Sequence, residues 1–265
     1  MVANKNKKPI VLVIAGHDPS GGAGIQADIE SIASAGCYAI SVITSLTAQN
    51  TDKVTKISSQ DPSFFREQIK LIFDDFNISA CKIGMISSPE IVSVIHEELS
   101  NIKVPIILDP IINSGTGKNL SSKKTYEKIL SELLPLSMII TPNSLEAKML
   151  TGTDDLKIAA NKLLGYGTKS VLITGSHEKT NAVLNTLYEK DSLPIKYEWE
   201  RLAGSFHGSG CTLSSRIAAN IVLGNNLKNA VEDAQEYTWQ TLKNGLQLGK
   251  RQIHPNRFFN AENDA

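Results

Sequence analysis

The sequence has little cysteine, no excess of charge of either sign and no long hydrophobic run. Its three cysteines, Cys37, Cys81 and Cys211, are too few for a disulfide framework and do not form a C-x-x-C metal site. The 27 basic and 27 acidic residues cancel, which argues against nucleic acid or an anionic membrane as partner. The apolar run at 10–15 is too short for a signal peptide or a membrane span. We therefore expect a cytoplasmic protein that binds small molecules.

The length and composition favour one domain. The 265 residues are 41% hydrophobic and 20% charged, close to globular averages, and no shift in composition divides them. We expect a flexible tail over residues 1–8 and a single domain over residues 9–265.

Short β-branched runs alternate with segments of helical periodicity. Strands are expected at 9–15, 38–46, 80–83, 104–108, 137–140 and 170–174, followed by a β-hairpin of 183–188 and 195–199. Helices are expected at 23–36, 61–76, 89–99, 121–134, 154–164, 211–223 and 227–248. This alternation predicts a doubly wound α/β fold with a mainly parallel sheet.

Polar clusters follow most of the predicted parallel strands. They are 16–18, 47–50, 84–85, 109–110, 141–143 and 174–175. Each cluster alone is ordinary turn chemistry. Because the carboxyl ends of parallel strands meet at one edge of a sheet, where ligands bind in such folds, we expect the six clusters to line one site.

The stretch 207–212 (HGSGCT) predicts a glycine-rich turn leading into a helix. A helix N-terminus offers unpaired N–H groups and a positive dipole end to a phosphate. A thiol in that first turn is expected to have a lowered pKa. The alternative at this point is an ordinary helix start with a buried cysteine.

Three familiar motifs are considered and not adopted. The segment 22–27 resembles a dinucleotide fingerprint but begins too far from its strand and lacks the acidic partner. The segment 115–118 lacks the first glycine and the Ser or Thr of a P-loop. A thiol–imidazole pair of Cys211 and His207 is the poorer interpretation in a phosphate-binding context.

Six motifs together resemble the hydroxymethylpyrimidine/phosphomethylpyrimidine kinases of thiamine biosynthesis, in the ribokinase-like superfamily. They are GHDPSGGAGIQAD (16–28), SVITSLTAQNT (41–51), KIGM (82–85), LDP (108–110), ITPNSLEAKML (140–150) and HGSGCTLS (207–214). The resemblance implies a three-layer α/β/α fold and a cytoplasmic homodimer. It also implies that ATP and Mg²⁺ are used to phosphorylate 4-amino-5-hydroxymethyl-2-methylpyrimidine and then its monophosphate.

Position by position, the resemblance assigns a pyrimidine pocket. Asp28 and Gln49 match positions near the polar edge of the ring, where an unpaired polar group would be costly. The residues that match the pocket wall are Gly16, Thr47, Met85 and Ile111.

The same comparison assigns the phosphate chemistry. Gly208, Gly210 and the backbone N–H of Cys211 match an anion hole, and the Cys211 thiol matches a general base. Asp109 and Glu146 match metal-binding positions. The nucleotide positions are Asn143, Glu146, Thr174, Gly175 and Ser209. Asn143 and Glu146 are three apart, on one face of a helix.

Three positions depart from the family pattern. His17 and Phe206 stand where threonine is common, and Thr174 stands where lysine is usual. Lys118 and His177 are the candidates to replace that lysine, and Lys118 belongs to a glycine-rich loop expected to form a flap. Two alternatives remain open: a pyridoxal kinase, and a non-catalytic pyrimidine-binding regulator.

Overall fold

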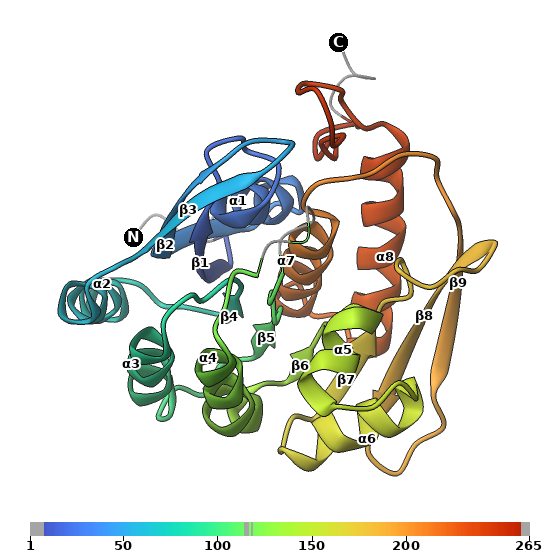
Figure 1. Cartoon of the computed structure of the whole chain (residues 1–265). Coiled ribbons are helices and arrows are strands. Elements are labelled where there is room, and N and C mark those ends of the chain that lie inside the picture. The colour runs from blue at the N-terminus through green and yellow to red at the C-terminus, as the bar shows by residue number, and fades with distance from the viewer. Residues whose placement is uncertain (1–7, 114–116, 118, 261–265) are drawn as a thin grey trace, which may run out of the picture.

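The computed structural model describes residues 8–113, 117 and 119–260. Within them the strands form one nine-stranded sheet of order β3-β2-β1-β4-β5-β6-β7-β8-β9. The central run from β2 to β7 is parallel, and β3, β8 and β9 pair antiparallel at the two edges (Figure 1). The predicted fold class is confirmed. Apart from Lys8, the expected N-terminal tail lies outside the described residues, as does Lys118 of the expected flap.

The strands are β1 (Ile10–His17), β2 (Tyr38–Gln49), β3 (Val54–Ser59), β4 (Ala80–Ile83), β5 (Ile106–Leu108), β6 (Ile139–Ile140), β7 (Ser170–Ile173), β8 (Ala182–Glu189) and β9 (Ile195–Glu200). The helices are α1 (Gly24–Ser34), α2 (Pro62–Asp75), α3 (Pro89–Leu99), α4 (Lys123–Lys128), α5 (Ser144–Thr151), α6 (Leu156–Gly165), α7 (Ser209–Val222) and α8 (Leu227–Lys243).

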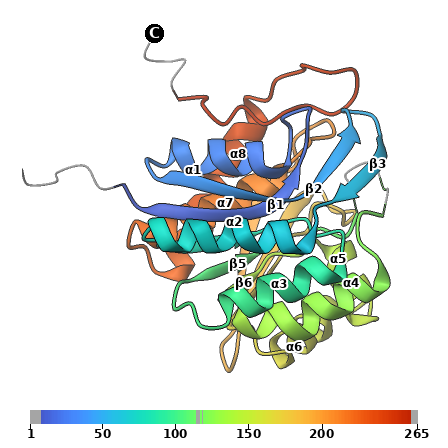
Figure 2. The ribbon, with the colours of Figure 1, turned by 90° about the vertical axis from the view of Figure 1, so that its left-hand side faces the viewer.

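Helices cover both faces of the sheet (Figure 2). One core cluster joins α2, α3, α4 and α6 to one face, and a second joins α1, α7 and α8 to the other. Strand β1 supplies both clusters because its alternate residues point to opposite faces: Leu12 and Ile14 enter the first, Val11 and Val13 the second. The continuous apolar run of β1 is thus explained by burial on both sides.

Capping side chains begin several helices where the sequence predicts. Asp61 accepts hydrogen bonds from the backbone of Ser63 and Phe64 at the start of α2, and Pro62 occupies the first helical position. Asn143 and Glu146 form a reciprocal capping box at the start of α5. This box confirms the helical spacing inferred for the two residues.

The structure differs from the sequence predictions at a strand and two helices. Strand β3 was not predicted, because its residues are mostly exposed and its conformation depends on pairing with β2. The helix expected at 121–134 is α4 followed by a π-helical turn and a short 3₁₀ helix. Helix α8 ends at Lys243, not at residue 248, because Leu246 N–H donates to the His254 carbonyl, at 2.8 Å, as the chain turns back. Residues 245–260, the C-terminal segment, then run beside the start of α7.

The direction of the connections changes at β1. Helix α1 leads from β1 to β2 on one side, whereas β4 pairs with β1 on the other. Doubly wound sheets place ligands at the carboxyl ends of the strands beside such a switch point. Helix α7 packs on β1, β4 and β5, so its N-terminus comes to the same edge.

Candidate active site

One cavity of about 540 Å³ occupies this edge of the sheet. Every site residue predicted from the sequence lines it except Asp28 and Gly175. The predicted residues among its lining are Gly16, Thr47, Gln49, Met85, Asp109, Ile111, Asn143, Glu146, Thr174, Gly208, Ser209, Gly210 and Cys211. Of the six strand-end clusters, 47–50 lies largely inside β2, which runs on to Gln49. The expected convergence of distant segments at one rim is observed.

The N-terminus of α7 opens into the cavity. Gly208 is the N-cap residue in the left-handed conformation (φ +81°), and no described side chain caps this end. Glycine is required at this position for a second reason, because a Cβ would lie 2.0 Å from the carbonyl oxygen of Gly22. The free N–H groups of the first turn therefore face the cavity, as an anion site needs.

The Cys211 thiol lies in this first turn and is 4% exposed. Burial raises the pKa of Cys211 to about 12, although the charge of Lys82 and a hydrogen bond from the Gly24 backbone act in the opposite direction. The expectation of a lowered pKa is therefore wrong, since desolvation outweighs the local positive field. The resting group at neutral pH is the thiol.

Asp109 and Glu146 form a buried carboxylate pair beside α7. Burial raises the pKa of Asp109 to about 6, and burial together with the charge of Asp109 raises that of Glu146 to about 8. Ser214 Oγ donates to Asp109 Oδ2 at 3.2 Å. No cluster of three or more His, Cys, Asp or Glu that could hold a metal occurs in the described residues. Two carboxylates without a closed cage suit Mg²⁺, which is commonly held by one or two carboxylates together with phosphates and water.

Asp28 lies on the sheet side of α1, away from the cavity. It is fully buried, and its Oδ1 accepts hydrogen bonds from Lys82 Nζ (2.8 Å) and Ser215 Oγ (2.7 Å). Asp28 does not line the cavity, and its Oδ2 is buried without a hydrogen-bond partner among the described residues. Its contact with the pyrimidine stays a prediction. Lys82, which sequence reasoning did not single out, is fully buried on β4. Burial lowers its pKa, but the combined charges of Asp28, Cys211 and Asp109, with the hydrogen bond to Asp28, raise it further than burial lowers it. Lys82 belongs to the motif KIGM (82–85), but nothing in the sequence indicated that it pairs with Asp28.

Gln49 and Met85 define one end of the cavity, next to β1 and β2. Met85 packs on Gly16, where a Cβ would lie 3.1 Å from Met85 Sδ, and an apolar cluster with Val54 of β3 stands behind it. Thr47 Oγ1 donates to the carbonyl of His17 at 2.8 Å. The donor capacity of the Thr47 hydroxyl is thus used within the protein, whereas the side-chain amide of Gln49 can hydrogen-bond to a ligand.

The other end of the cavity lies between β8, β9 and α8. Trp199 and Trp239 line it, with ring centroids 6.5 Å apart. Asn185 Nδ2 and Trp199 Nε1 both donate to Gln235 Oε1, at 2.8 and 3.1 Å. Sequence reasoning missed this aromatic and amide group because its members come from three separate elements.

Gly175 lies just beneath the lining. Its N–H donates to Asn185 Oδ1 at 3.0 Å, and a Cβ would lie 2.2 Å from the carbonyl oxygen of Leu184. Thr174 and His177 do reach the cavity, as does Arg201. The Arg201 guanidinium already donates to three backbone carbonyls, so it is not a free cation for phosphate.

Asp18 and His207 form a buried contact that the sequence did not indicate. His207 Nε2 lies 2.7 Å from Asp18 Oδ2, which also accepts from the backbone of Ala23 at 2.9 Å. Burial alone would raise the pKa of Asp18, but the hydrogen bond and charge of His207, with the Ser20 hydrogen bonds, lower it to about 2. Because His207 Nε2 is hydrogen-bonded to the ionised Asp18, it is not available to Cys211, which argues against a Cys211–His207 catalytic pair.

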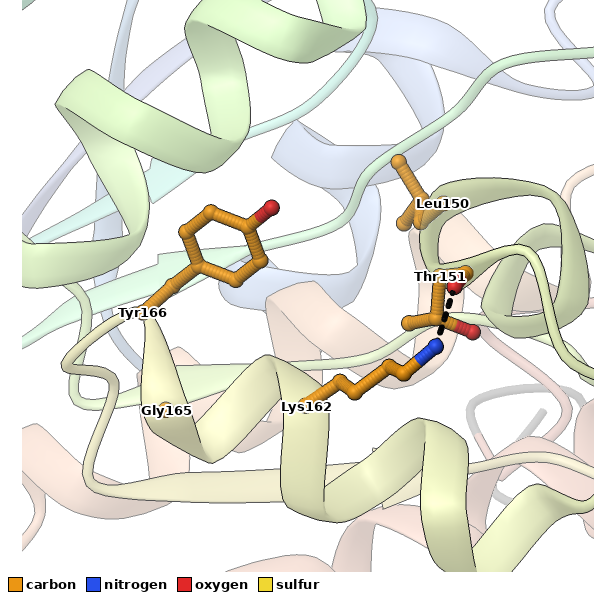
Figure 3. A pocket seen from close by; sticks show the side chains of 5 residues that line it. All are labelled: Leu150, Thr151, Lys162, Gly165 and Tyr166. Carbon is orange, nitrogen blue, oxygen red and sulfur yellow. Dashed lines mark hydrogen bonds between the residues drawn. The ribbon is translucent and has the colours of Figure 1, made fainter.

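A second, smaller hollow lies between α5 and α6 (Figure 3). Its one cationic group, Lys162 Nζ, donates to the Thr151 carbonyl at 3.0 Å, and Tyr166 stands on the opposite wall. Besides Lys162, the polar side chains on its walls are the hydroxyls of Thr151 and Tyr166. In the described part of the chain, no helix has the length and apolar character to cross a membrane.

Comparison with known proteins agrees with this geometry. The family model described as phosphomethylpyrimidine kinase matches residues 18–256. The chain belongs to this family. A hydroxymethylpyrimidine/phosphomethylpyrimidine kinase of Aquifex aeolicus is 39% identical over 91% of this chain and 97% of its own length. The resemblance inferred from the six motifs is confirmed.

Two solved structures are similar to this chain. The phosphomethylpyrimidine kinase of Clostridium difficile 630 matches with TM-score 0.78 and 36% identity, over 89% of this chain and 100% of that one. An ADP complex of Bacillus subtilis pyridoxal kinase matches with TM-score 0.86 but 26% identity, over 96% and 99%. The fold is thus common to both kinds of kinase, whereas the sequence is nearer to the pyrimidine kinases.

Proposed function

We propose that this kinase transfers the γ-phosphoryl group of ATP to hydroxymethylpyrimidine, and then to its monophosphate, to give the diphosphate. One observation supports this most strongly: the N-terminus of α7 opens into the cavity between its Gln49–Met85 end and the Asp109–Glu146 pair. A phosphoryl group positioned there lies between an acceptor pocket and the carboxylates that hold the metal.

The acceptor pocket suits a flat, aminated ring. Met85 and Ile111 offer an apolar wall, Gly16 lets Met85 lie close to the sheet, and the Gln49 amide can both donate to and accept from ring nitrogens and an amino group. A site built to hydrogen-bond a ring rejects an analogue that leaves its polar group unpaired.

The opposite end suits a nucleotide. Trp199 and Trp239 provide aromatic surface for a base, and the lining residues Asn143, Thr174 and Ser209 lie along the route from there to α7. Asp109 and Glu146 would hold Mg²⁺, which neutralises charge on the phosphates when bound.

Positioning and electrostatic stabilisation supply most of the rate in phosphoryl transfer. The N–H groups at Gly208, Gly210 and Cys211 stabilise the charge that develops on the transferred group. The deprotonated form of Cys211, a small fraction at neutral pH, accepts the proton of the hydroxymethyl group in the first step. General-base catalysis of this kind typically contributes about 10²- to 10⁴-fold. The phosphate acceptor of the second step is already ionised and needs no base.

A coupled assay of ADP release tests the proposal. Hydroxymethylpyrimidine, its monophosphate and pyridoxal are compared under the same conditions, with products identified by mass spectrometry. We expect turnover of both pyrimidines and a lower kcat/KM for pyridoxal. A higher kcat/KM for pyridoxal would indicate a pyridoxal kinase, and pyrimidine binding without ADP release would indicate the non-catalytic regulator.

We also propose that the protein is a cytoplasmic homodimer. The exposed side chain of Leu46 on β2 lies next to β3, which forms this edge of the sheet, and exposed apolar side chains at a sheet edge favour pairing with a second copy. Light scattering after size exclusion should give twice the 28.7 kDa chain mass. A monomeric mass with full kinase activity would contradict the dimer alone.

A further inference from the structure

The C-terminal segment braces the start of α7 from outside the cavity. His207 N–H donates to the Ile253 carbonyl at 2.9 Å, and Ile253 N–H donates to the Ser205 carbonyl at 2.8 Å, so the segment pairs with the loop that leads into α7. Tyr237 of α8 donates to the carbonyl of Arg257 at 2.9 Å. Sequence reasoning assigned no role to this segment.

Arg257 is 3% exposed, and its guanidinium links three parts of the chain. Nη2 donates to the Gly22 carbonyl at 2.5 Å, Nε donates to Thr212 Oγ1 on α7 at 3.0 Å, and Nη1 donates to Glu30 Oε2 on α1 at 3.0 Å. Charge-assisted hydrogen bonds of this kind are stronger than neutral ones, and the planar guanidinium fixes their directions. Arg257 therefore ties α1 to α7.

The peptide unit between Gly22 and Ala23 is held at both ends. Its carbonyl accepts from Arg257, and its N–H donates to Asp18 Oδ2 at 2.9 Å. The same carbonyl oxygen lies against Gly208, where a Cβ would be only 2.0 Å away. The next N–H along the chain, that of Gly24, hydrogen-bonds to Cys211.

We propose that Arg257 is a positioning residue for phosphoryl transfer: its guanidinium holds the Gly22 carbonyl against Gly208 and so keeps the first turns of α1 and α7 in the relation that Cys211 requires. The kinetic part of this inference rests on the proposed kinase function. Arg257 is not among the residues that line the cavity, so it acts through Gly22 and Thr212 and touches no substrate.

Kinetics of three variants test the proposal. Arg257→Met removes the charge, Arg257→Lys keeps it without the planar fork, and Arg251→Met is a matched control because the Arg251 side chain is 72% exposed in the same segment. Measured at about 20 °C on folded protein, Arg257→Met should lower kcat about ten- to a hundredfold, with each KM within about twofold of wild type. The kcat of Arg257→Lys should lie between those of Arg257→Met and wild type, and the kcat of Arg251→Met should equal that of wild type.

Alkylation of cysteines by iodoacetamide gives a second readout that needs no kinase activity. Loss of the Gly22 anchor should increase the alkylation rate of Cys211 several-fold in Arg257→Lys, while Cys81, fully buried on β4, stays protected. General destabilisation would expose both thiols together. Mass spectrometry of the two peptides separates the cases.

The outcomes are distinct. Wild-type protein without kinase activity contradicts the proposed function but leaves the alkylation test of Arg257 intact. Active wild type with an unchanged kcat in Arg257→Met, or equal alkylation of Cys211 and Cys81 in Arg257→Lys, overturns the positioning role. If Arg257→Met does not fold, Arg257→Lys decides by the same two criteria.

Discussion

Lys82 is a buried cation close to three acidic groups whose roles differ. It pairs with Asp28 at 2.8 Å, and its charge lowers the pKa values of Asp109 and Cys211 against the effect of burial. The sequence supplied each of these side chains but not their mutual placement, because they come from α1, β4, α7 and the end of β5. The pKa of Cys211 was predicted in the wrong direction because its burial, which raises the pKa, outweighs the charge of Lys82.

The pH dependence of the two phosphorylation steps should differ because only the first needs Cys211. Below a pKa of about 12, the deprotonated fraction of the thiol rises tenfold per pH unit. The ratio of first-step to second-step kcat/KM should therefore increase about tenfold per unit between about pH 7 and 9. Titration of Asp109 and Glu146 should affect both steps equally, because both steps need these carboxylates, and it therefore does not change the ratio of the two kcat/KM values.

Cys211→Ala is the control for that profile. It should lower the first step about 10²-fold or more, affect the second step much less, and leave the ratio independent of pH. A ratio that is flat with pH in the wild type, or equal losses in both steps of the variant, would remove Cys211 from the role of base.

Glu146→Gln should stabilise the metal-free protein while impairing catalysis. The folded-state pKa of Glu146, about 8, lies above its usual value of 4.5, so its stabilising protonated form is fully present below about pH 4.5 and is lost as pH rises through 8. A neutral side chain removes this penalty. We expect a gain of about 1–3 kcal/mol in unfolding free energy at about pH 8.5, in urea melts with EDTA.

The matched control for this variant is Glu127→Gln, whose side chain is 57% exposed and should change stability by less than about 0.5 kcal/mol. Glu146→Gln should also weaken the Mg²⁺ dependence of the kinase reaction. Lower stability of Glu146→Gln than of wild type in the same alkaline buffer would show that the buried carboxylate is not the destabilising form.

Among the helices and strands, those specified by neighbouring residues were predicted correctly from the sequence. The Asp61–Pro62 start of α2 and the β8–β9 hairpin could be predicted because capping chemistry and strand alternation are written in neighbouring residues. Strand β3 could not, because its order comes from the turn at Asn50, whose side chain accepts from the backbone of Asp52 and Lys53, and from pairing with β2. The C-terminal segment likewise follows from contacts with distant residues.

The glycine at the start of α7 provides a test at this scale. Gly208 and Gly224 both have positive φ, +81° and +98°, but a Cβ on Gly224 meets open space. Gly224→Ala should cost about 1–2 kcal/mol, the usual penalty of a left-handed non-glycine residue. Gly208→Ala should cost about 3 kcal/mol or more, because the methyl group overlaps the Gly22 carbonyl, and should abolish turnover. Equal thermal shifts in the two variants would contradict the close approach.

For the molecule as a whole, we expect residues 9–265 to unfold as one unit. Strand β1 pairs with both β2 and β4, and α7 packs on β1, β4, β5, α1 and α8, so neither half of the sheet is independent of the other. Calorimetry should show one transition of about 180 kcal/mol near about 60 °C, with equal calorimetric and van't Hoff enthalpies. Two resolved transitions would contradict the single-domain organisation.

Because Arg257 lies close to the C-terminal end of the sequence, it is among the last residues of that sequence to be added during synthesis. Chains emerge from the ribosome N-terminal end first, and a nascent chain that reaches only to the end of α8 already contains Gln49, Asp109, Glu146 and Cys211. It lacks the guanidinium that fixes the Gly22 carbonyl beside Gly208. On the proposed role of Arg257, an unfinished or prematurely released chain would carry its ligand-binding residues without efficient turnover, and activity would mark a chain synthesised past residue 257.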